Sequence, residues 1–173
     1  MSLQSVALFP AGHHENQSGG RDGLVAPLAI SELRAVIPTH SFDAAKLHYS
    51  DSDIPFRAVI RRHLPKWSKL GRGDRALFYS HGSYYASAQI VFTGQWPKLG
   101  ESIFGDNRTH KGELWELFCF FDVDWKPLNI PVTVVNEALG YESERPLFGF
   151  TVIKDAEKVA RVKQIIESPV YSR

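Results

Sequence analysis

The stretch GDRALFYSHGSYYASAQIVF, residues 73–92, predicts a β-hairpin around which the rest of the chain is arranged. The apolar run Ala76–Tyr79 has the length of a strand. Ser80–Ser83 predicts the loop, because glycine readily adopts a positive φ and serine bonds nearby backbone. Tyr84–Phe92 alternates in side-chain type and predicts the second strand. The small residues Ala86–Ala88 leave space beside the sheet, which either a packed helix or a ligand would fill.

The composition of the chain is that of one ordinary globular domain. It has 173 residues, of which 43% are hydrophobic, enough to bury a core. No apolar run approaches the roughly 18 residues of a membrane span, and the first residues do not have the pattern of a signal peptide. Cys119 lies in an apolar run and predicts a small buried side chain without a disulfide. We therefore expect a cytoplasmic protein.

Basic residues are concentrated in one part of a chain whose net charge is only +1. Between Phe56 and Arg75 there are seven lysines and arginines and a single acid, Asp74. Such a cluster is either a solvated helix face or a phosphate-binding surface. The residues that we predict to contact phosphates are Arg57, Arg61, Arg62, Lys66 and Lys69.

The remaining segments predict short strands with a few helices between them. This order indicates a small α+β protein with a barrel-like sheet. Strands are expected at Val6–Pro10, Arg34–Pro38, Glu113–Val123 and Pro146–Ile153, with an edge strand or turn at Leu128–Val135. Helices are expected from Ser41 or Asp43 to Leu47, from Phe56 to Leu64, and over Asp155–Glu167, with Pro65 ending the second helix. A long loop is expected over Gln95–Thr109.

No motif of a known catalytic class is present. The sequence has no dinucleotide-binding glycine pattern, P-loop, zinc-protease motif or nucleophile elbow. His13 and His14 are adjacent, but no further ligand follows at a suitable spacing, so neither a metal nor a cofactor is expected. Asp122 and Asp124 are a possible carboxylate pair. The enzymatic alternative is a small enzyme acting on a nucleotide-like metabolite, with His81 and Asp122 as acid and base.

Three aromatic residues, Tyr49, Trp96 and Phe104, fall in segments whose composition predicts polar loops. Burial is not required of an aromatic side chain in such a loop. Aromatic side chains beside a basic surface can stack on an unpaired base. The pattern therefore favours nucleic-acid binding.

The order of elements resembles the YTH and EVE branches of the PUA-like superfamily. The similarity lies in the hairpin Leu77–Gly82 running into Ala86–Val91, and in Phe121–Trp125 followed by Leu128, Ile130 and Pro131. It covers roughly residues 33–167. The resemblance implies a small PUA-like (EVE/YTH-like) β-barrel with surrounding helices over residues 33–173, preceded by an N-terminal extension, 1–32, of unassigned role.

The resemblance also implies a function. Domains of these branches bind DNA or RNA and often hold one modified base in an aromatic cage. Matching positions give Tyr49, which precedes Ser50, as the first wall, where the family commonly has tryptophan. Trp96 or Phe104 would form the second wall and Trp115 a third, while Tyr79 and His81 would line the pocket beside Ala86–Ala88. No nuclease motif is present, so cleavage in a modification-dependent restriction system would need a partner polypeptide.

Overall fold

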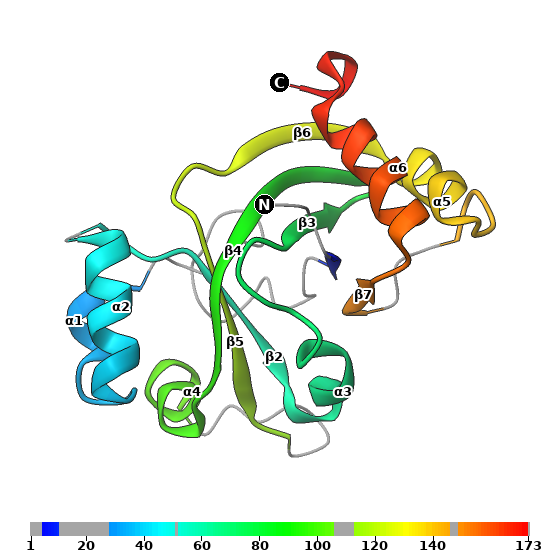
Figure 1. Cartoon of the computed structure of the whole chain (residues 1–173). Coiled ribbons are helices and arrows are strands. Elements are labelled where there is room, and N and C mark those ends of the chain that lie inside the picture. Colours follow the sequence, from blue (N-terminus) through cyan, green and yellow to red (C-terminus); the bar gives the residue numbers. More distant parts are fainter. Residues whose placement is uncertain (1–4, 11–27, 51, 106–112, 146–148, 173) are drawn as a thin grey trace.

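A single curved sheet forms the centre of the molecule (Figure 1). The computed structural model describes residues 5–10, 28–50, 52–105, 113–145 and 149–172. Within them the strand order is β2-β5-β4-β3-β1-β7, and β6 pairs with β4 off this path. The sheet is curled into a half-barrel with helices around it, so the α+β class is confirmed, whereas a closed barrel is not observed among the described strands.

The expected hairpin is confirmed by β3 (Arg75–Ser80) and β4 (Ser83–Gln95). The two turn residues have positive φ, 48° at His81 and 81° at Gly82. This is the pattern of a type I′ turn, whose twist matches that of antiparallel strands. At the other end of β3, the buried Asp74 fixes the expected turn, because its carboxylate accepts hydrogen bonds from Ser5 Oγ at 2.6 Å and Gly71 N at 2.9 Å.

Strand β4 is long enough to pair with different strands along its two halves. Its first part pairs with β3 and with β6 (Lys126–Pro131), and its second part with β5 (Trp115–Phe121). Register shifts occur at Ile90–Phe92 and Tyr84–Ala86. Bulges of this kind bend a strand and increase its twist, which accounts for the curl.

The strand expected near the start of the chain is also confirmed. β1 (Val6–Pro10) pairs in parallel with β3 and antiparallel with β7 (Thr151–Ile153). This part of residues 1–32 thus lies within the sheet. The division into residues 1–32 and 33–173, drawn from the extent of the resemblance, stays a prediction.

The helix expected at Phe56–Leu64 is wrong. Phe56–Ile60 forms β2, which pairs with β5, and is followed by a 3-10 turn, η2 (Arg61–His63), and α3 (Leu64–Trp67). Five residues with two apolar faces suit a strand when a partner strand is available. Pro65 stands in the first turn of α3, where its missing N–H is not needed, and so begins a helix instead of ending one.

Two further local predictions are corrected. Residues 34–38 form a turn between α1 (Ile30–Leu33) and α2 (Thr39–Tyr49), not a strand. The loop expected after Gln95 is helical over α4 (Pro97–Phe104), with proline again at the helix start.

The C-terminal elements follow the predicted order with different bounds. The segment expected as an edge strand or turn is β6 and then α5 (Val132–Leu139). The helix α6 (Ala156–Glu167) is confirmed, with the Asp155 side chain accepting a hydrogen bond from Lys158 N. It is followed by the short turn η3 (Pro169–Tyr171).

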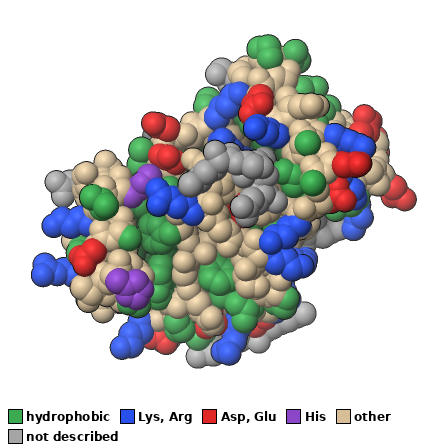
Figure 2. All heavy atoms as spheres, in the orientation of Figure 1, with side chains coloured by type: hydrophobic (Ala, Val, Ile, Leu, Met, Phe, Trp, Pro, Cys, Tyr) green, Lys and Arg blue, Asp and Glu red, His purple; other side chains and the backbone are tan. Residues whose placement is uncertain are grey.

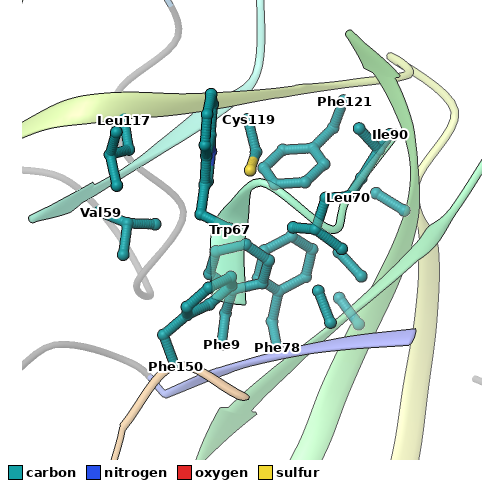
Figure 3. Packing of buried hydrophobic residues seen from close by; sticks show 14 residues of the cluster. Phe9, Val59, Trp67, Leu70, Phe78, Ile90, Leu117, Cys119, Phe121 and Phe150 are labelled. Atoms are coloured by element: carbon teal, nitrogen blue, oxygen red, sulfur yellow. The ribbon is translucent and has the colours of Figure 1, made fainter. Parts of the chain in front are cut away.

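Both faces of the sheet are covered. The inner face is the one on which α3 packs. There Trp67 and Leu70 share a cluster with Ala86, Ala88 and Phe78 (Figure 3). The space beside the small residues is therefore filled by the core and not left open.

The outer face carries two clusters. One lies with α5 and α6 and includes Leu77 and Tyr84, and the other lies with α1, α2 and α4 and includes Phe118 and Phe120. Cys119 is buried with a free thiol on the inner face. None of the described helices is long and apolar enough to span a bilayer.

Candidate functional site

Four polar residues lie on the outer face between its two apolar clusters. On β4, Ala88 and Ile90 belong to the inner cluster, so Ser87 and Gln89 alternate to the outer face. Arg75 is the register partner of Gln89, and Asp122 N donates to Gln89 O at 2.9 Å. We call Arg75, Ser87, Gln89 and Asp122 the outer polar strip.

The charges of the outer polar strip are partly compensated. Burial lowers the pKa of Arg75, whereas the nearby carboxylates of Glu167 and Asp122 raise it. Ser87 is fully buried, and its Oγ has no hydrogen-bond partner among the described residues. A guanidinium donates, a carboxylate accepts and an amide does both. The strip therefore offers the groups needed to read the hydrogen-bonding edge of a base.

Tyr49 borders this strip but is a packed residue. It ends α2, is 3% exposed, and its hydroxyl donates to Phe121 O at 2.7 Å. Burial, and secondarily the charge of Asp122, raises the pKa of the Tyr49 hydroxyl. The expectation of a loop aromatic is wrong here. Ser50 follows it with an exposed side chain and a φ of 53°.

The other aromatic residues predicted for a cage lie on the same side as Tyr49. Trp96 is half-buried directly before α4, with its ring centroid 5.6 Å from that of Phe120. The rings of Phe104 and Trp115 lie 5.8 Å apart. Phe92 connects Tyr49 to Trp96, at centroid distances of 6.2 and 6.1 Å. These residues form one group around α2 and α4.

Tyr79 and His81 do not belong to that group. The Tyr79 ring lies 5.5 Å from Tyr84 in the cluster under α5 and α6. His81 is exposed at the hairpin turn, where its Nδ1 lies 2.6 Å from Ser80 Oγ. Gln89, which is bonded to Asp122, lies at the far end of the hairpin, roughly 20–25 Å from His81 at the usual strand rise. His81 and Asp122 are thus too distant to act as one acid–base pair.

The predicted phosphate-binding residues divide into exposed and buried ones. Arg61 and Arg62 are exposed and form ion pairs with Glu116 and Glu113, each at 3.7 Å. Lys66 Nζ donates to a backbone carbonyl, and Lys69 is exposed. Arg57 differs from them, because it points to the inner face with two buried guanidinium nitrogens. Figure 2 shows basic side chains at several separate places on one face of the molecule.

The sequence contained a signal for the outer polar strip. Ser87 and Gln89 interrupt an otherwise apolar strand at alternate positions, which indicates a polar place on one face. Within the described residues, no three histidine, cysteine, aspartate or glutamate side chains gather in a way that could hold a metal ion. His13 and His14 lie outside those residues.

The comparisons with known proteins concern mainly the fold. No family model matches the chain, and no curated protein matches it. Among solved structures, the N-terminal domain of Thermococcus gammatolerans McrB bound to m5C DNA is similar, with a TM-score of 0.62 and 17% sequence identity. The similarity covers 94% of this chain and 97% of that domain. At this identity the likeness shows a shared fold, whereas the assignment to the PUA-like superfamily and to its YTH or EVE branch stays a prediction.

Proposed function

We propose that this chain is a nucleic-acid-binding module that reads one extruded or unpaired modified base, with 5-methylcytosine in DNA as the first candidate. The observation that carries the proposal is the likeness of nearly the whole chain to a domain bound to m5C DNA. The fold alone does not determine function, so the proposal also requires a suitable site.

The outer polar strip would read the base. The Asp122 carboxylate can accept from the N4 amino group of a cytosine, and Arg75 or the Gln89 amide can donate to its N3 and O2. Trp125 follows in the same turn and is 46% exposed, so its ring is available for stacking. Tyr49 would border the base. Trp96, Phe104 and Trp115 would support this wall from behind.

Exposed cations would hold the backbone. Lys69 and Arg72 lie on the turn before β3, next to the end of the strip at Arg75. Arg61, Arg62 and Lys66 lie farther along the same segment. The side chains of these cations are exposed, whereas Glu116 is buried and would keep its hydrogen bond from Gln95 Nε2, at 2.8 Å, if Arg61 turned to a phosphate.

The energies are compatible with base extrusion. Taking a base out of a duplex costs a few kcal/mol, and stacking on an aromatic side chain returns about 1–3 kcal/mol per base. Cleavage of bound DNA would come from a nuclease partner in a modification-dependent restriction system, with this chain as its recognition part.

The test is a titration of the whole chain with fluorescent oligonucleotides, single- and double-stranded, that differ only in one base. We expect tighter binding of 5-methylcytosine than of cytosine, and affinity that falls steeply with salt. Arg161→Ala, which removes an exposed helix ion pair on α6, is the control and should bind unchanged. Equal affinity for all bases, or binding that does not depend on salt, would refute the proposal.

A further inference from the structure

The inner face contains a charged group that the proposed function does not use. Arg57 lies on β2 opposite Cys119 of β5, and Val59 on the same strand belongs to the inner apolar cluster. Its side chain is half-buried, and its Nε and Nη2 atoms are buried without a hydrogen-bond partner among the described residues. An unpaired buried charge is one of the more costly features that a folded protein can have.

The two unpaired atoms belong to the same edge of the guanidinium. Nε–H and Nη2–H point in parallel and form the fork that binds two oxygens of one planar group. Burial lowers the pKa of Arg57, but an arginine in a protein keeps its charge, so the fork remains a cationic donor pair.

The neighbours of Arg57 supply donors and rings. The Tyr85 hydroxyl lies close enough to interact electrostatically with it, and the Tyr85 ring lies 6.3 Å from that of Phe78. Trp67 packs in the same cluster as Cys119 (Figure 3), and its indole N–H is buried beside the Cys119 thiol, to which it donates.

From this arrangement we propose that the inner face holds a carboxylate-binding site, in which the two oxygens of one carboxylate accept from Arg57 Nε and Nη2. A carboxylate matches the fork in shape and neutralises one positive charge with one negative charge. A phosphate carries a charge between about −1.5 and −2 at neutral pH, and would leave excess charge in an apolar place. The ligand is therefore either a small free carboxylate or the Asp or Glu side chain of a bound polypeptide.

This site is independent of the outer polar strip. Arg57 and Arg75 lie on opposite faces of the sheet, and the nucleic-acid proposal assigns no role to Arg57. Failure of either proposal would leave the other standing.

The test measures thermal unfolding of the whole chain in sodium benzoate, acetate or phosphate, with chloride keeping the ionic strength constant. Benzoate is the main probe because its ring can pack against apolar side chains. We expect benzoate, and more weakly acetate, to raise the melting temperature by a few degrees in a saturable way, as a ligand of the native state does.

Three variants make the test specific. Arg57→Met removes the unpaired charge at similar volume, so its melting temperature without ligand should be unchanged or higher, and the benzoate effect should disappear. Arg57→Lys keeps the charge without the fork and should weaken benzoate binding at least tenfold. Arg161→Met, at an exposed arginine of α6 that neither proposal uses, should respond to benzoate as the parent does.

Two outcomes would overturn the site. One is a parent protein whose melting temperature is indifferent to carboxylates or responds more to phosphate. The other is an Arg57→Met protein that keeps the full benzoate response. A lower melting temperature of Arg57→Met without ligand would also count against it, because the guanidinium would then have protein partners. If the site holds, titration with Asp- or Glu-containing peptides and with free benzoate distinguishes the two sources of the carboxylate.

Discussion

Two arginines on opposite faces of one sheet have opposite surroundings. Arg75, in the outer polar strip, is flanked by the carboxylates of Asp122 and Glu167 and lies beside Gln89. Arg57, on the inner face, has two buried donors and no acceptor for them among the described residues. Both side chains are half-buried, but carboxylates lie near the first charge and two donors of the second have no acceptor among the described residues. The comparison shows that the same residue type can lie near carboxylates on one face of a sheet and without acceptors for two of its donors on the other.

The largest effect on stability is expected from a core residue of the sheet that separates the two arginines. Phe120 is fully buried on the outer face, with its ring stacked on Phe92 at 4.5 Å. Phe120→Ala should lower the free energy of unfolding by about 3–5 kcal/mol, through lost burial and a cavity. Denaturant unfolding measures it, with Phe120→Leu as a milder control. A loss below about 1 kcal/mol would mean that this strand is not covered on both faces.

The next effect sharpens the contrast between the two arginines. Arg75→Met and Gln89→Leu should each weaken binding of the preferred oligonucleotide by about 1–3 kcal/mol, the worth of a good base contact. Arg57→Met should leave oligonucleotide binding unchanged. Fluorescence anisotropy on the three variants measures this. The reverse ranking would move base reading from the outer to the inner face.

A smaller effect concerns the residue that borders the strip. Tyr49→Phe should lower the free energy of unfolding by about 1 kcal/mol, because Phe121 O loses its buried hydrogen bond. Since the folded pKa of Tyr49 is raised, the unfolded chain holds fewer protons above pH 10, and stability should fall as pH rises beyond that value.

Unfolding midpoints from pH 8 to 11 would show this loss, and Tyr49→Phe should reduce it. The slope should not vanish, because burial also raises the pKa of Tyr84. If stability falls as steeply between pH 8 and 11 in Tyr49→Phe as in the parent, the group whose ionisation causes the fall is not Tyr49.

The smallest effect on stability is expected at the hairpin turn, which lies far from the outer polar strip and serves as a control. His81 adopts a φ of 48° at the hairpin turn, where asparagine before glycine is preferred. His81→Asn should raise stability by about 0.5 kcal/mol and leave both oligonucleotide and benzoate binding unchanged. Altered binding of either ligand would show that the turn takes part in a site.

The sequence was informative where structure is local. The hairpin at residues 73–92 and the helix begun by Asp155 depend on turn chemistry, alternation and capping, which neighbouring residues determine. The local pattern of Phe56–Ile60 predicts a helix, but the segment is a strand because it pairs with β5, far along the chain. Pro97 is compatible with a loop as well as with the first turn of a helix, and α4 begins there.

The candidate site was less predictable than the fold. Arg57 and Arg61 contribute the same charge to the basic cluster in the sequence. Only the pairing of β2 with β5 shows that Arg57 points to the inner face, whereas Arg61 is exposed. Tyr49 has polar neighbours in sequence, yet its burial follows from the packing of α2 on the sheet. Composition gives the types of side chain that the protein has, whereas the register between distant strands decides which side chains lie close together.

The position of β1 has a consequence for how the chain folds. This strand lies between β3 and β7, and its pairing with β7 joins Val6 to Ile153, about 150 residues apart. Contacts so distant in sequence require closure of a long loop before they contribute stability, and they slow folding. During synthesis β1 can pair with β3 once residues 75–80 have been made, but its pairing with β7 must wait until nearly the whole chain has been made. Until then the edge of β1 that faces β7 is unpaired, and the growing chain has an exposed strand edge at risk of pairing with another chain.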